Sequence, residues 1–119
     1  MKSLAVLAAL FTSMIAEAHI SASPSFVSFY QVNVGSSQTR YVRISNDGRE
    51  AVQVSVGGGC FGDIQTMSAC NLTLEPFQSC SVTVRFSPRR EGYQSCSFSA
   101  SGSDGSIATV NVSGQGVDL

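Results

Sequence analysis

Residues 70–92, CNLTLEPFQSCSVTVRFSPRREG, decide the fold class of this 119-residue chain. Cys70 and Cys80 bracket a turn-like segment, and the second cysteine opens a strict alternation of polar and apolar residues. A period of two predicts a β-strand with one buried face and one solvated face. The stretch therefore predicts either a stapled corner of a β-sandwich or a redox or metal site.

The same alternation recurs through the chain. It marks strands at 26–30, 41–45, 51–56, 82–86, 94–100 and 108–113. Turn residues separate the strands, notably Asn46-Asp47-Gly48 and Gly102-Ser103-Asp104-Gly105. Beyond residue 18, no stretch keeps an apolar 3.6-residue period for three turns. We therefore expect an all-β fold, an immunoglobulin-like antiparallel β-sandwich of about seven strands.

The first 18 residues, MKSLAVLAALFTSMIAEA, differ from the rest. They combine Lys2, an apolar run and the small-x-small end Ala16-Glu17-Ala18, which is the pattern of a secretory signal peptide. The apolar run is too short to span a bilayer. We expect cleavage after Ala18, a single domain at 19–119, and a bacterial periplasmic or secreted protein that does not span the membrane.

The charged residues beyond residue 18 exclude several classes of partner and chemistry. Beyond residue 18 the chain has six arginines, seven acidic residues and no lysine. A nucleic-acid or anionic-membrane partner would call for a clustered basic face. The missing lysine excludes Schiff-base chemistry and a phosphate-loop lysine. We therefore expect no nucleic-acid partner.

The four cysteines predict two disulfides, because an even number in a short exported domain is typical of such staples. Their spacing lacks the C-x2-C pairs of zinc sites. Strands 51–56 and 94–100 should run antiparallel in one sheet, which favours Cys60 with Cys96 and leaves Cys70 for Cys80. The alternative, Cys60 with Cys70 and Cys80 with Cys96, stays open.

The opening stretch resembles the hallmark of bacterial choice-of-anchor D domains, in the Hydin-type, major-sperm-protein-like branch of immunoglobulin folds. The residues that carry this resemblance are Cys70, Leu74, Ser79-Cys80, Phe86-Ser87-Pro88 and Gly92. Similar pieces are Phe26 to Phe29 with Val34-Gly35, Val42 to Gly48, and Val110 to Gly116. The resemblance implies a binding or scaffolding role without common catalytic residues. The chain departs from the family at Pro76-Phe77-Gln78, where Pro-Gly or Ala-Gly is usual.

Few residues of the chain could serve in catalysis or hold a cofactor. His19, the one histidine, is not placed in a pattern that would serve a serine or cysteine nucleophile. After cleavage it would become the amino terminus and could chelate copper through its amine and ring. Such sites need further imidazole or thioether ligands, and Met67 is the only methionine beyond residue 18. His19 is therefore a weak metal candidate, and we expect no cofactor and no enzyme.

Four residues are candidates for an interface. Phe61 and Phe77 fall in predicted loops beside cysteines, where aromatic rings either cap a small core or anchor a partner. Arg89 and Arg90 fall in a predicted turn, where they either solubilise the tip or contact a partner. Both readings stay open for each pair.

The combined expectation is a non-enzymatic domain that binds protein in the cell envelope, as an accessory subunit of an envelope or surface assembly. Exposed edge strands suit pairing with a partner's strand. One alternative is a fimbrial subunit or its chaperone, although the lead before Phe26 is short and a full final strand is present. The other alternative is a periplasmic copper protein that uses His19.

Overall fold

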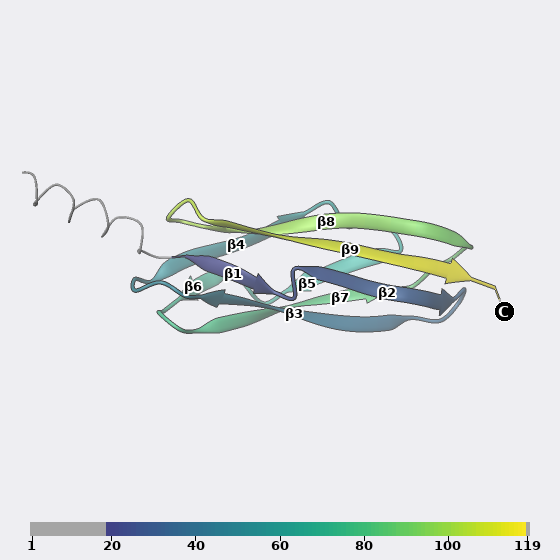
Figure 1. The fold of residues 1–119 in the computed structure, drawn as a ribbon, viewed down its shortest axis with the longest axis horizontal. Coiled ribbons are helices and arrows are strands. Elements are labelled where there is room, and N and C mark those ends of the chain that lie inside the picture. Colours follow the sequence, from purple (N-terminus) through teal and green to yellow (C-terminus); the bar gives the residue numbers. More distant parts are fainter. Residues whose placement is uncertain (1–18, 119) are drawn as a thin grey trace, which may run out of the picture.

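The computed structural model describes residues 19–118, which form a two-layer β-sandwich with no helix in that range (Figure 1). This confirms the predicted all-β sandwich. The four-stranded sheet has the order β1 (Ile20–Ser23), β3 (Gln38–Asn46), β7 (Ser79–Phe86), β5 (Ile64–Ser68). The five-stranded sheet has the order β2 (Phe26–Asn33), β9 (Ile107–Val117), β8 (Gly92–Gly102), β4 (Val52–Gly58), β6 (Leu72–Leu74). The predicted signal peptide lies outside the described residues.

The strand count and one pairing direction differ from the expectation. The described chain has nine strands rather than about seven, because the lead at Ile20–Ser23 forms β1 and two short strands, β5 and β6, were not predicted. The alternation missed β5 and β6 because each buries a single side chain. The chain changes sheets at the cis bond between Ser23 and Pro24, and β2 then runs parallel to β9. The sandwich is therefore not purely antiparallel.

The core contains the side chains that the alternation placed inward. Buried residues from the predicted strands include Val52, Val54, Val82, Val84, Phe86, Phe98, Ala100, Val110 and Val112. Two aromatic rings from opposite sheets meet in the core, since the centroids of Phe29 and Phe86 are 5.6 Å apart. The guanidinium of Arg40 lies 5.4 Å from the centroid of the Phe29 ring and covers it from the side of β3. Burial of alternate side chains from both sheets is what holds such a sandwich together.

The loops gather at the two ends of the sandwich. The β3–β4 and β8–β9 turns lie at one end, which we call the N-terminal end because β1 begins there (Figure 1). The β7–β8 turn lies at the other, C-terminal end, where β2 and β9 also finish (Figure 1). The β4–β5 loop crosses from one sheet to the other on the C-terminal side, because Ile64 pairs with Phe86 at the end of β7. Loops at sandwich ends are common sites of binding.

Candidate functional site

One carboxylate fastens the β4–β5 loop to the β7–β8 turn. Asp63 Oδ1 accepts a hydrogen bond from Arg89 Nε at 2.8 Å. Asp63 Oδ2 accepts from the backbone amide of Arg89 at 3.1 Å and from Gln94 Nε2 at 2.8 Å. The Asp63 side chain is only 7% exposed, whereas that of Arg89 is 79% exposed. The pair therefore joins a covered carboxylate to a guanidinium that reaches into solvent.

These contacts also set the charge state of the carboxylate. The hydrogen bond from the Gln94 side chain, followed by those from Arg89, lowers the pKa of Asp63 from 3.8 to about 2. Hydrogen bonds to the ionised form stabilise it, which is why the proton binds less tightly. Asp63 therefore stays ionised near neutral pH and holds the Arg89 side chain in one orientation.

Three of the four interface candidates gather around this pair. Phe61, Arg89 and Arg90 line an open groove of about 480 Å³ together with Asp63 and Gln94. Sequence reasoning missed Asp63 and Gln94, because their roles depend on a contact between residues 31 positions apart. Only the position of Asp63 as the one acid of the β4–β5 loop could have drawn attention to it. We call Phe61, Arg89 and Arg90 the loop-end surface.

The fourth candidate, Phe77, lies at the opposite end. It follows Pro76 in the β6–β7 turn, and its backbone amide donates to the carbonyl of Asn46 at 2.8 Å, where β3 ends. Its side chain is 84% exposed, and that of Phe61 is 76% exposed. Neither ring therefore caps the core, and a role for either ring in an interface stays a prediction.

Both disulfides have the pairing that the strand arrangement favoured. Cys60 bonds to Cys96, and Cys70 bonds to Cys80, with Cα–Cα distances of 5.2 and 5.4 Å. No cysteine in the described chain is free. Two disulfides are consistent with an extracellular or periplasmic location. In residues 70–92, Cys70 and Cys80 therefore form a structural staple.

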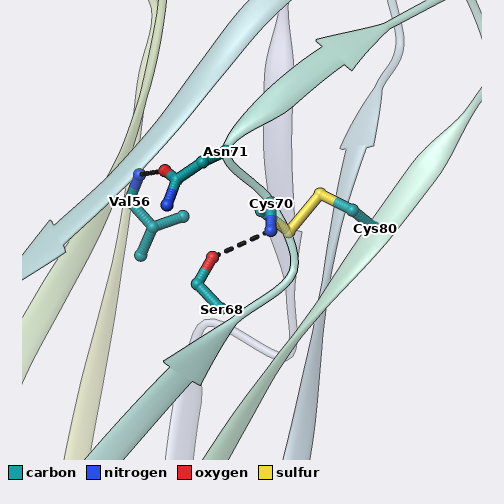
Figure 2. The surroundings of a disulfide bond; sticks show 5 residues. All are labelled: Val56, Ser68, Cys70, Asn71 and Cys80. Carbon is teal, nitrogen blue, oxygen red and sulfur yellow. Dashed lines mark hydrogen bonds between the residues drawn. A yellow bond between two sulfur atoms is a disulfide. The ribbon is translucent and has the colours of Figure 1, made fainter.

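Figure 2 shows how the Cys70–Cys80 bond is supported by its neighbours. The amide of Cys70 donates to Ser68 Oγ at 2.9 Å. Asn71 Oδ1 accepts a hydrogen bond from the amide of Val56 at 3.0 Å, which ties the β5–β6 loop to β4 of the five-stranded sheet. The staple and these two bonds together fix the chain where it crosses between the sheets.

His19 lies exposed at the N-terminal end, and its carbonyl accepts a hydrogen bond from the amide of Asp47 at 2.8 Å. Burial tends to raise the pKa of the Asp104 carboxyl, but hydrogen bonds from Ser106 and the charge of His19 outweigh this effect, so the pKa is lowered.

Within residues 19–118, no three or more His, Cys, Asp or Glu side chains are grouped to hold a metal ion. The same residues contain no helix long and apolar enough to cross a membrane.

Several solved structures share this fold. The chain superposes on the ASH/PapD-like domain 7 of human CEP192 with a TM-score of 0.73 and 12% identity, covering 87% of each chain. The VesB protease of Vibrio cholerae matches with a TM-score of 0.66 and 16% identity, covering 89% of this chain but 34% of the protease. A protein of unknown function from Porphyromonas gingivalis W83 matches with a TM-score of 0.68 and 14% identity, covering 84% and 48%.

Sequence comparison places the chain in a family. No curated protein matches it significantly. The family model described as ASH, abnormal spindle-like microcephaly-associated, ASPM-SPD-2-Hydin, matches residues 14–104. That range includes eight of the nine strands, and it agrees with the Hydin-type resemblance of residues 70–92. The chain therefore belongs to the ASH (ASPM-SPD-2-Hydin) family.

Proposed function

We propose that this chain is an exported accessory subunit of a bacterial cell-envelope or surface assembly, and that it binds a protein partner through the loop-end surface. The ASH family and the PapD-like fold indicate a protein-interaction domain of a typically non-catalytic kind. The signal-like segment at residues 1–18 and the two disulfides support export. The family features of residues 70–92 support a place in the bacterial choice-of-anchor D branch.

The observation that carries the proposal is the meeting of Phe61, Arg89 and Arg90 around a covered carboxylate. Aromatic and arginine side chains are the types that contribute most to protein–protein binding. Arg89 is held in place by Asp63 before any partner arrives, so binding need not order it. Phe61 adds exposed apolar area to the groove that the two arginines also line. A partner with an apolar socket flanked by carboxylates fits this arrangement.

The experiment is a co-purification from the cells that make the protein. The tagged chain is isolated gently from the envelope, and proteins retained at near-stoichiometric amounts are identified. We expect one or two defined envelope proteins with the unmodified chain. Phe61→Ala and Arg90→Ala should each lower the retained amount at least five-fold, because each removes a side chain that would be covered by the partner.

The matched control is Phe77→Ala, which removes a similarly exposed ring from the opposite end. Retention should be unchanged in this variant. Loss of the partner with Phe77→Ala but not with Phe61→Ala would place the binding surface at the N-terminal end instead. If no envelope protein is retained at near-stoichiometric amounts, the accessory-subunit proposal is wrong.

A further inference from the structure

We propose that the outer face of the five-stranded sheet binds a neutral polysaccharide, which stacks on Tyr30 and Tyr93 and lies along β8 and β9. This binding site is separate from the loop-end surface and would be a second function of the domain. It follows from the composition of one sheet, from a groove at the C-terminal part of that sheet, and from a strained residue beside the groove.

The five-stranded sheet contains no charged residue. Its strands β2, β4, β6, β8 and β9 include no Asp, Glu, Lys, Arg or His. The other sheet has arginines on β3 and β7. A protein surface usually carries charged side chains at about a quarter to a third of its positions, so an uncharged sheet of this size is unusual. A charged ligand would lose hydration here without gaining a counter-charge, which is costly. A neutral ligand has no charge to desolvate, and its polar groups can hydrogen-bond to the sheet.

Aromatic and amide side chains line a groove on this face. Phe26, Tyr30 and Tyr93 lie along an open groove of about 610 Å³, together with Gln31, Gln115 and two serines. All three rings are largely exposed. Aromatic rings offer flat apolar surfaces, while side-chain amides both donate and accept hydrogen bonds. A pyranose sugar matches both properties, because its C–H groups form an apolar face and its hydroxyls form a polar rim.

Tyr30 is held in an unfavourable backbone conformation at this groove. Its φ is 57°, in the left-handed region that an aromatic residue rarely adopts, and the β2–β9 register shifts between Ser28 and Gln31. A β-bulge of this kind turns a side chain away from its regular direction. Residues held in sparsely populated conformations cluster at binding sites, where the surrounding structure maintains them. The bulge therefore places the Tyr30 ring where it lines the groove.

A row of hydroxyl and amide groups continues from the groove along the sheet. Tyr93 pairs with Gln115 across the β8–β9 ladder, and the next outward pair along these strands is Ser95 with Ser113. Further along, Ser99 Oγ lies 3.3 Å from Thr109 Oγ1. At 3.4 Å per residue, the outward positions of β8 from Tyr93 to Ser101 extend ~27 Å. A track of this length suits an extended polymer better than a small molecule.

A protein partner fits this face less well. Serine is depleted in protein–protein interfaces, and here it occupies four successive outward positions of β8. Strand addition to the free edge of β2 is disfavoured, because the bulge at Tyr30 interrupts the regular row of backbone groups. A neutral chain of sugars needs neither a deep apolar pocket nor an unbroken strand edge.

The test is affinity electrophoresis of the full chain in gels that contain one polysaccharide each. The neutral probes are dextran, xyloglucan, galactomannan and mixed-linkage β-glucan, and alginate is the anionic comparison. We expect at least one neutral polysaccharide to retard the protein, with a retardation that persists from about 0.05 to 0.5 M NaCl because no charges are involved. Alginate should not retard it.

Tyr93→Ala and Tyr30→Ala should each weaken binding to the retarding polysaccharide at least ten-fold. Phe61→Ala and Phe77→Ala, which remove exposed rings elsewhere, should bind as the unmodified chain does. Thermal unfolding checks that each variant is folded, and Tyr93→Phe, which keeps the ring, should retain most of the binding. The loop-end variants would lose the protein partner but keep the polysaccharide, so the two proposals fail independently.

Three results would overturn the proposal. The first is that none of the neutral polysaccharides retards the protein. The second is that Tyr30→Ala and Tyr93→Ala bind the retarding polysaccharide normally, which would place the site elsewhere. The third is that the chain associates with itself and that Tyr93→Ala makes it monomeric without any polysaccharide binding, which would make this face an interface between two copies.

Discussion

The side-chain amide of Asn46 donates a hydrogen bond to the carbonyl oxygen of Leu74 at 3.0 Å, and thereby joins the end of β3 to the end of β6 in the other sheet. The same nitrogen donates to the carbonyl of Glu50 at 2.8 Å, and Oδ1 accepts from the amide of Gly48 at 2.9 Å. Asn46 is fully buried. One side chain thus organises the β3–β4 turn and its contact with β6.

We expect Asn46→Ala to lower the free energy of unfolding by about 2–4 kcal/mol. Three buried or half-buried backbone groups would lose their partner, and such groups are costly to leave unpaired. Urea unfolding followed by tyrosine fluorescence measures the change. Asn33→Ala, at an exposed position of β2, should stay within about 0.5 kcal/mol of the unmodified chain. Equal stability of the two variants would mean that the Asn46 contacts do not hold the turn.

Phe77 occupies the third position of a turn in which the amide of Gln78 donates to the carbonyl of Glu75 at 3.0 Å. Its φ of 68° follows a proline, which is the arrangement of a type II turn, where glycine is preferred. We expect Phe77→Gly to raise the free energy of unfolding by about 1 kcal/mol, because glycine has no penalty in the left-handed region.

Phe77→Ala is the control for that change, since it removes the ring but keeps a Cβ. Its stability should remain within about 0.5 kcal/mol of the unmodified chain. Chemical unfolding of the three proteins under identical conditions gives the comparison. A Phe77→Gly variant that is less stable than Phe77→Ala would show that the turn does not carry this conformational cost.

Gly114 lies against the ring of Phe86, and a Cβ at this position would come within 2.6 Å of Phe86 Cε2. Gly114→Ala should therefore destabilise the domain by about 1–3 kcal/mol through overpacking. Gly57→Ala is a suitable control, because a Cβ there meets nothing within 4 Å. In a Phe86→Leu background the cost of Gly114→Ala should fall, and a double-mutant cycle measures this coupling. If Gly114→Ala destabilises the Phe86→Leu variant as much as the unmodified chain, the ring of Phe86 is not the source of the strain.

The two disulfides close loops of different length, with separations of 36 and 10 residues. In the chain-entropy account these loops contribute about 4 and about 3 kcal/mol respectively. We expect Cys80→Ser to lower the free energy of unfolding by about 2–5 kcal/mol. Non-reducing peptide mapping should recover Cys60 linked to Cys96. An unchanged unfolding midpoint in Cys80→Ser, or a peptide that links Cys60 to Cys70, would contradict the structure.

Asp63 makes stability depend on pH in the acid range. Its pKa is about 2 in the folded chain against 3.8 ordinarily, so protonation favours the unfolded state. Its contribution is fully present above about pH 4 and is lost as the pH falls from about 4 towards 2. We expect Asp63→Asn to cost about 1–2 kcal/mol at neutral pH, because an amide cannot accept all three hydrogen bonds.

The stability difference between the unmodified chain and Asp63→Asn should shrink as the pH is lowered from 5 to about 2. Urea unfolding at several pH values provides this measurement. The exposed Glu91→Gln variant serves as the control and should follow the unmodified chain throughout. A difference that stays constant down to about pH 2 would mean that Asp63 does not titrate as described.

The alternation of side chains determined which residues of β4, β7, β8 and β9 face the core, because a period of two is a local property of each strand. The turns after Asn46 and Gly102 were predictable for the same reason, since Asn, Asp and Gly favour turns by themselves. Strands β5 and β6 were missed, because strands of 5 and 3 residues are too short to show a clear period. The lead at Ile20–Ser23 became a strand only through its pairing with β3.

The sequence by itself thus determined the fold class, the candidate residues of the loop-end surface and a favoured disulfide pairing. Only the tertiary structure decided that Phe61 lines one groove with Arg89 and Arg90, while Phe77 lies at the other end. It also decided that Tyr30 and Tyr93, far apart in the chain, line one groove on an uncharged sheet. Which side chains are buried follows from the alternation within each strand. Which residues from distant parts of the chain lie side by side follows from the order of the strands in the sheets, and contacts between distant strands set that order.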